Sequence, residues 1–254
     1  MSSCPQSPRV SSGSVEKKSA SSLEQVQDTL IKFFHQTTCD NVVSADKMMV
    51  RARGPVWHRK HPQQGIIPAG LKGLDTEATW SYSKSDGRVY GHGTFCRVAC
   101  AHCMRGACKW MRNSANEAKR MWLETGKLHG LITTVLMDSK ADEKELFREL
   151  RRQRGIRLLT TPRKGSAISP ERQRMVKVLK QKRHQHLYQQ RRYTVEPMQG
   201  LIKDLFALET CWMRGQAHNR WLFAAMGVVI QMHQYRAWQE GRSTWAIKQE
   251  VLGQ

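Results

Sequence analysis

Three acidic residues stand where the sequence predicts that buried elements begin or end. Asp46 ends a predicted strand over 41–46, Asp138 ends another over 131–137, and Glu196 begins a predicted apolar helix. Strand ends at one edge of an α/β sheet are where active-site groups usually lie. Three converging carboxylates could hold two Mg²⁺ ions, which activate a water molecule and stabilise the leaving oxygen in phosphodiester cleavage. On spacing alone, helix caps and surface ion pairs are the alternative interpretation.

The order of predicted elements indicates an α/β fold, a mixed sheet flanked by helices. Two capping boxes, at 22–25 and 114–117, predict helices that continue to His35 and to about Glu124. Pro197 disfavours helical geometry at the residue before it, so Glu196 is expected at a helix start. The other predicted strands and helices follow in chain order: strands over 79–83 and 89–100, a helix over 143–154, a strand over 156–159, and helices over 170–190, 196–211 and 217–236.

The charge of the chain points to a polyanionic partner. Its 254 residues carry 42 lysines and arginines against 21 acidic residues, a formal net charge of +21. Nucleic acid and an anionic membrane surface both fit such a charge. The longest apolar run, 221–230, is too short to span a bilayer, and residues 1–22 lack a secretory core. We therefore expect a cytoplasmic protein that binds nucleic acid and no membrane.

Basic side chains are concentrated shortly before and after Glu196. Lys180, Lys182 and Arg183 lie on the predicted basic helix and are candidates for phosphate contacts, with a solvated helix face as the alternative. Arg192 and Lys203 lie on either side of Glu196, and Lys203 is two turns further along, which places it on the same side of a helix. These two residues are the sharper candidates for DNA contact.

The stretch 188–196, together with Lys203, resembles the C-terminal signature of bacterial DDE insertion-sequence transposases. In that family an arginine precedes the catalytic glutamate by four residues and a lysine follows it by seven, and Arg192, Glu196 and Lys203 match both spacings. Tyr188 corresponds to the family tyrosine. The regions around the first two acidic residues are also similar to the family, over 44–58 and 131–164.

This resemblance implies a ribonuclease H-like fold with Asp46, Asp138 and Glu196 as the catalytic, metal-binding triad. It implies two Mg²⁺ ions, for which Mn²⁺ can substitute, and metal-dependent cleavage and strand transfer of DNA. The expected partners are transposon ends and target DNA, bound by a homodimer in the bacterial nucleoid. With Arg192, Lys203 and Tyr188, the three residues of the basic helix are the expected DNA contacts.

The resemblance and the composition together divide the chain into four parts: a disordered tail rich in serine and lysine (1–21), an N-terminal helix (22–38), a DDE transposase catalytic domain (39–236) and a C-terminal tail (237–254). Only 45 residues precede Asp46, whereas the family usually has a substantial N-terminal DNA-binding region. An N-terminally truncated element is therefore expected.

Two alternatives remain open at this point. One is a DNA-binding remnant without catalytic activity. The other is a metalloprotein with cysteine ligands, because Cys96, Cys100, Cys103 and Cys108 lie close together in the sequence and His102 adds a possible zinc ligand. Small reduced residues at a strand end are the simpler interpretation of this cluster.

Overall fold

In the computed structural model, residues 12–58, 71, 73–83, 86–163 and 169–253 are described, except for the side chains of residues 12–18, 105 and 107. The strands are β1 (Val42–Arg51), β2 (Thr79–Ser83), β3 (Gly87–Ala99), β4 (Arg105–Arg112), β5 (Thr134–Leu136) and β6 (Arg157–Leu159). The helices are α1 (Ser12–Thr38), α2 (Glu117–Gly126), the short 3-10 turn η2 (Ser139–Ala141), α3 (Lys144–Arg154), α4 (Pro170–Leu179), α5 (Lys182–Leu205), α6 (Gln216–Gln239) and α7 (Lys248–Leu252).

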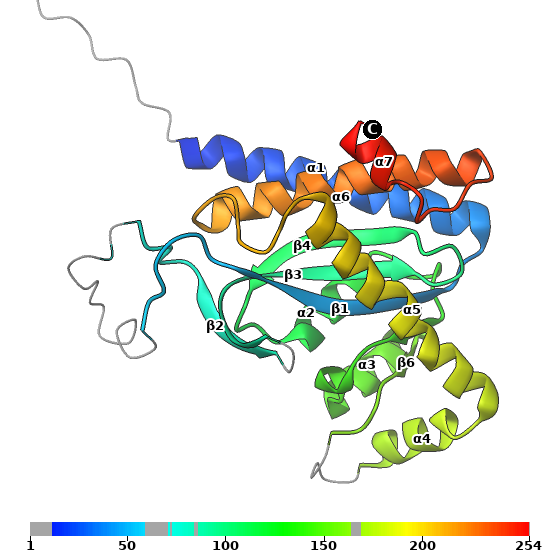
Figure 1. Ribbon diagram of the computed structural model, residues 1–254. Coiled ribbons are helices and arrows are strands. Elements are labelled where there is room, and N and C mark those ends of the chain that lie inside the picture. The colour runs from blue at the N-terminus through cyan, green and yellow to red at the C-terminus, as the bar shows by residue number, and fades with distance from the viewer. Residues whose placement is uncertain (1–11, 59–70, 72, 84–85, 164–168, 254) are drawn as a thin grey trace, which may run out of the picture.

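A single mixed sheet organises the chain, with strands in the order β2-β3-β1-β5-β6 (Figure 1). β1 pairs antiparallel with β3 on one side and parallel with β5 on the other, and β6 continues the parallel part. On the edge that faces away from β1, β3 pairs with β2 along its first residues and with β4 along the rest. The sequence predicted five of these strands and missed β4. It left residues 48–52 either as a hairpin partner of the strand over 41–46 or as its extension, and β1 shows that they extend it.

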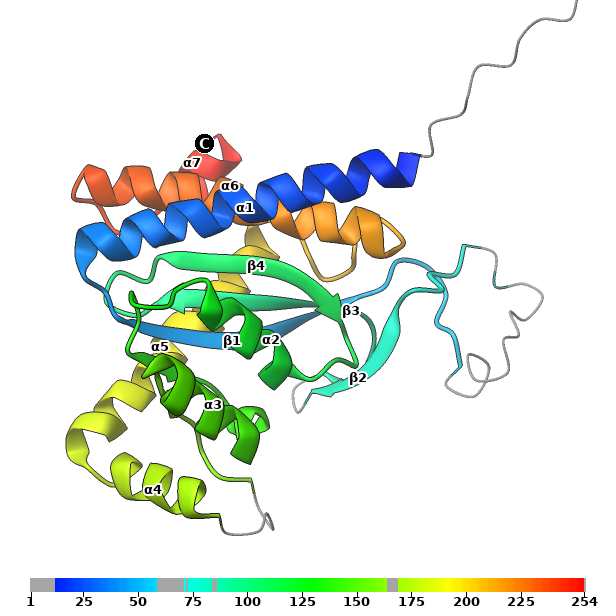
Figure 2. The ribbon, with the colours of Figure 1, turned by 180° about the vertical axis from the view of Figure 1, so that it is seen from behind.

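The two faces of the sheet carry two separate cores, and β1 contributes to both because its side chains alternate. Val43 and Ala45 pack with α2 and α3, whereas Met48 and Val50 pack with α5 and α6. Figures 1 and 2 show α5 across one face of the sheet, with α2 and α3 on the other. Helices cover both faces of the sheet, so side chains that point to either face are buried.

α1 is longer than predicted and belongs to the core. It begins at Ser12, so the expected disordered tail is helical from that residue onward, and Ser22 lies inside the helix rather than at its cap. Residues 1–11 of that tail lie outside the described residues. Contacts hold the helix from Ala20 onward: Ala20 is buried, and Glu24 forms an ion pair with Arg220 of α6 at 2.8 Å.

Buried polar contacts fix α1 against the sheet and α6. The side chain of Gln27 donates to the carbonyl of Ala224 at 2.8 Å and accepts from the backbone N–H of Cys108 at 2.7 Å. The next residue, Asp28, binds the fully buried ammonium of Lys109 at 2.6 Å. Removing α1 would leave the N–H of Cys108 without this partner and Lys109 with Glu124 as its remaining acidic partner among the described residues, which makes the helix an integral part of the fold.

The C-terminal helices differ most from the prediction. The expected helix over 170–190 is two helices, α4 and α5, which break at Lys180–Gln181. α5 continues past Pro197, so Glu196 lies in mid-helix and not at a helix start. The burial of Val195, Met198 and Ile202 along one side of α5 outweighs the lost backbone hydrogen bond.

The expected C-terminal tail is partly folded as well. It contains the end of α6 and the short helix α7, and Ala237 and Ile247 are buried. None of the helices in the described part of the chain combines the length and apolar character that crossing a bilayer requires.

Two helical glycines give a matched test of how α1 packs on α6. A Cβ at Gly227 would lie 2.5 Å from Gln27 Nε2, and Gln27 is held by hydrogen bonds at both ends of its amide. A Cβ at Gly200 of α5 meets nothing within 4 Å. We expect Gly227→Ala to lower the free energy of unfolding by about 1–3 kcal/mol. Gly200→Ala should raise it by roughly 0.5–1 kcal/mol, the usual gain in helix propensity.

Denaturant unfolding of both variants measures the difference. Equal stabilisation by the two substitutions would show that Gln27 is not locked between α6 and β4.

Candidate active site

The parallel pairing of β1 and β5 brings Asp46 and Asp138 together. Val42, Val43 and Ser44 pair with Thr134, Val135 and Leu136 in turn. Continuing this register by two residues places Asp46 opposite Asp138.

β5 ends at Leu136, whereas β1 continues to Arg51. Between Ser44 and the isolated bridge from Arg51 to Thr210, β1 therefore pairs with no described strand on its β5 side, and a pocket can open there. This is the carboxyl end of the parallel strands, the usual place for a ligand site in an α/β sheet.

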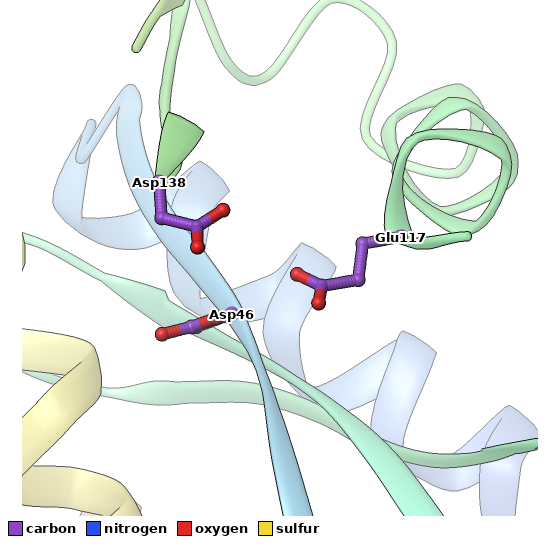
Figure 3. Close-up of side chains that lie close together, drawn as sticks. All are labelled: Asp46, Glu117 and Asp138. Atoms are coloured by element: carbon purple, nitrogen blue, oxygen red, sulfur yellow. The ribbon is translucent and has the colours of Figure 1, made fainter. Parts of the chain in front are cut away.

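A third carboxylate, that of Glu117, completes this cluster. One carboxylate oxygen from each of Asp46, Glu117 and Asp138 lies within 4.8 Å of the others. Figure 3 shows the three side chains pointing toward one another from β1, from α2 and from the end of β5.

Glu117 was not among the predicted site residues, because its position fits a capping box. In the structure Asn116 is the N-cap, and its side chain accepts from the N–H of Ala118 at 2.8 Å. Glu117 is thereby free to face the sheet. The available signal was its spacing of four residues from Met121, which is buried on the same side of α2.

Burial and like charge raise the proton affinity of the cluster. Burial, followed by the neighbouring Glu117 carboxylate, raises the pKa of Asp46 to about 7. Burial also raises the pKa of Glu117, although Lys140 opposes the rise. Within the described residues, the buried Oε2 of Glu117 has no hydrogen-bond partner. The site therefore holds negative charge that its own hydrogen bonds do not satisfy.

Two lysines partly neutralise Glu117. The Nζ of Lys140 lies 3.3 Å from its Oε1, and the Nζ of Lys47 lies 3.7 Å from the same oxygen. Lys47 also donates to the carbonyl of Asn113 at 2.8 Å, which fixes its position. Asp138 caps η2 by accepting from the N–H of Lys140 at 2.9 Å, so the strand end and the lysine are held as one unit.

Glu196 reaches the cluster through Arg191. The two terminal nitrogens of the Arg191 guanidinium contact Glu196 Oε1 at 2.5 Å and Asp46 Oδ2 at 3.1 Å. A buried hydrogen bond of 2.6 Å between the hydroxyls of Ser44 and Thr194 fixes this part of α5 against β1. Each hydroxyl lies two residues before one of the carboxylates, so Asp46 and Glu196 face each other across the bridging arginine.

One pocket of about 1190 Å³ contains most of the predicted site residues. Asp46, Asp138, Glu196, Tyr188, Arg192 and Lys203 all line it, as does Arg191. Lys180, Lys182 and Arg183 do not line it; they are exposed where α4 gives way to α5. The match in spacing selected Arg192, but the arginine that contacts the carboxylates is Arg191.

The carboxylate cluster fits a divalent cation. Its ligands are hard oxygens, which Mg²⁺ and Mn²⁺ prefer. Glu117 Oε2 is buried and unsatisfied, and the proton that Asp46 holds near neutral pH is the one that a cation would displace. A carboxylate set of this kind can bind a metal ion.

The cysteines that the structure describes do not form a comparable site. Cys96 and Cys108 are cross-strand neighbours on β3 and β4, and both are buried. In the described part of the chain, Asp46, Glu117 and Asp138 are the only set of three or more histidine, cysteine or acidic side chains close enough to share an ion. The cysteine-ligated alternative has no such set among these residues.

Comparison with known proteins supports the fold. No protein-family model matches the sequence, and no curated protein matches it either. A cryo-electron microscopy structure of a piggyBac transposase synaptic complex with hairpin DNA is similar, with a TM-score of 0.51 and 10% sequence identity. The similarity covers 83% of this chain and 51% of the other, so this chain spans about half the length of that protein.

The fold is ribonuclease H-like. The mixed sheet with helices on both faces and this structural similarity together confirm the predicted α/β class.

The raised pKa of Asp46 predicts a pH-dependent affinity for metal. Below pH 7 a proton competes with the cation for this carboxylate, so the association constant for Mn²⁺ should fall about tenfold for each pH unit. Above about pH 8 it should level off. Isothermal titration calorimetry from pH 5.5 to 8.5, without DNA, measures this dependence.

Asp204→Asn is the matched control, since Asp204 is exposed on α5 and does not line the pocket. It should leave the profile unchanged, whereas Asp46→Asn should abolish most of the binding. A flat wild-type profile between pH 5.5 and 7 would contradict the raised pKa.

Proposed function

We propose that this chain is the catalytic domain of a DDE-type transposase, which cuts DNA strands and joins the freed 3′ hydroxyl to target DNA. The observation that carries the proposal is the meeting of Asp46, Asp138 and Glu196 in one basic pocket of a ribonuclease H-like fold, with Glu117 close to both aspartates. The match of Arg192, Glu196 and Lys203 to the transposase spacing supports it independently.

In this proposal Asp46, Asp138 and Glu196 hold two Mg²⁺ ions, and Glu117 is a further ligand that the family signature does not include. Bound divalent ions polarise the scissile phosphate and activate the attacking oxygen. The carboxylates supply the negative charge that holds such ions, which the surrounding lysines and arginines cannot do. Mn²⁺ has the same preference for oxygen ligands and should substitute.

The basic residues of the pocket bind and orient the DNA strand. Lys203 and Arg192 line the pocket on either side of Glu196 and would contact phosphates, and Tyr188 lies one turn earlier on α5. Arg191 now pairs with Asp46 and Glu196, so it must withdraw before both carboxylates can hold cations. The released guanidinium is then free to bind a DNA phosphate.

The wider functional context follows from the same proposal. The partners would be transposon ends and target DNA, engaged by a homodimer. The protein would act in the bacterial nucleoid. Lys180, Lys182 and Arg183 are exposed at the start of α5 and would extend the contact with the DNA backbone beyond the pocket.

Substitution of single carboxylates tests the proposal. Asp138→Asn, Glu196→Gln and Glu117→Gln should each reduce strand cleavage by a factor of roughly a hundred or more. Losing a metal ligand costs several kcal/mol of transition-state stabilisation, and each 1.36 kcal/mol is tenfold in rate. DNA binding should be retained or slightly tighter, because each change removes one negative charge facing the DNA. Pre-nicked and end-mimicking oligonucleotides should be assayed with Mg²⁺ and with Mn²⁺.

Asp204→Asn controls for loss of an acidic group on the same helix outside the pocket, and it should cleave at the wild-type rate. If the wild-type chain binds DNA but cuts none of these substrates with either metal, the enzyme assignment fails and a DNA-binding remnant takes its place. If Glu117→Gln alone retains full activity, Glu117 is not a ligand.

A further inference from the structure

A second basic depression lies away from the carboxylate pocket. It is a groove of about 520 Å³ formed by α3, the start of β5, the whole of β6, and α4. Its charged lining consists of five arginines and one glutamate: Arg148, Arg151, Arg152, Arg157, Arg174 and Glu171. The buried side chains of Phe147 and Met175 also line it. We call this surface the arginine groove.

The arginine groove and the carboxylate pocket lie at opposite ends of β5. Thr134 begins β5 and lines the groove, whereas Asp138 follows the end of β5 and lines the pocket. Four residues of extended strand separate them, about 13 Å. The two sites are therefore distinct, yet close enough for one DNA molecule and the enzyme to meet at both.

The guanidinium groups of the groove are largely uncompensated. Arg148 pairs loosely with Glu171 at 3.6 Å, and Arg157 lies 2.7 Å from the ring nitrogen Nε2 of His184. Arg151, Arg152 and Arg174 are exposed and make no ion pair with any described residue. The pKa of His184 is lowered, first by burial and then by Arg157 and Arg183, as expected in a field of positive charge.

We propose that the arginine groove binds the phosphodiester backbone of DNA outside the segment that is cut. Guanidinium groups bind phosphate oxygens through paired hydrogen bonds, and arginines spread over two helices and a strand suit an extended polyanion. The groove offers few other polar groups that could read bases, so it would position DNA without selecting sequence. The identity of the polyanion rests on the proposed function of the carboxylate pocket.

A double substitution tests this inference. Arg151→Gln with Arg174→Gln removes two exposed guanidiniums from two helices, and neither side chain makes an ion pair among the described residues. Binding of a 30-base-pair duplex should be measured across salt concentrations in metal-free buffer. The slope of log affinity against log salt should become shallower by about 2, since each phosphate contact contributes roughly 0.9.

The matched control is Lys32→Gln with Lys248→Gln, which removes the same charge from exposed positions on α1 and α7. Figures 1 and 2 place α1 and α7 beyond the β4 edge of the sheet, whereas α3 and α4 lie near β6 at the opposite edge. The control should leave the salt slope unchanged, and the thermal midpoints of both variants should match that of the wild type.

Cleavage kinetics distinguish the arginine groove from the carboxylate pocket. The groove variant should need more DNA for half-maximal cleavage but reach the wild-type rate at saturation. An unchanged salt slope in the groove variant would overturn the groove inference and leave the proposed enzyme intact. If the wild type binds DNA through the groove but cleaves none, the proposed enzymatic activity is wrong and the groove inference is supported. Absence of DNA binding by the wild type would refute both.

Discussion

Mutual repulsion between carboxylates is the constraint on which the rest of the site depends. The oxygens of Asp46, Glu117 and Asp138 lie within 4.8 Å of one another. Two unit charges at that separation repel by about 3 kcal/mol at an effective dielectric constant of roughly 20. The fold holds them there through strand register and helix packing. It offsets the repulsion with a retained proton on Asp46, with Lys47 and Lys140 beside Glu117, and with the Arg191 bridge.

The sequence predicted the part of the site that depends on local signals. A buried strand ending in Asp138 is visible as a β-branched apolar run, and the placement of Asp46 beside it follows from parallel pairing. Glu117 could not be found this way, because its approach depends on how α2 packs on the sheet. β4 escaped detection for a similar reason: its residues carry buried Lys109 and Cys108, whose pairing with α1 is not apparent locally.

The course of α5 shows how tertiary packing overrides a local rule. Pro197 predicts that a helix should begin there, yet α5 runs through it from Lys182 to Leu205. Pro197 has no N–H, so the carbonyl of Tyr193 loses its usual helical donor immediately beside Glu196. The hydrogen bond between Ser44 and Thr194 fixes the helical turn before Pro197, and the buried side chain of Met198 fixes the turn after it. The helix is thereby anchored on both sides of its weakest point, where Glu196 and Arg191 must rearrange for cations to bind.

The packing of α1 on α6 also determines the order in which the chain can fold. The side chain of Gln27 donates a hydrogen bond to the carbonyl of Ala224, 197 residues further along the chain. Glu24 pairs with Arg220 over a similar separation in sequence. Contacts between residues so far apart in the chain slow folding, since the entropy of closing the loop is lost before the contact forms. During synthesis, α1 can meet β4 before α6 exists, but its contacts with Ala224 and Arg220 cannot form until α6 has followed. The buried charges of Lys109 and Arg97 pair with Asp28 of α1 and with Glu124 of α2, so β3 and β4 can bury them only between these two helices, whereas the cover that α6 provides comes later.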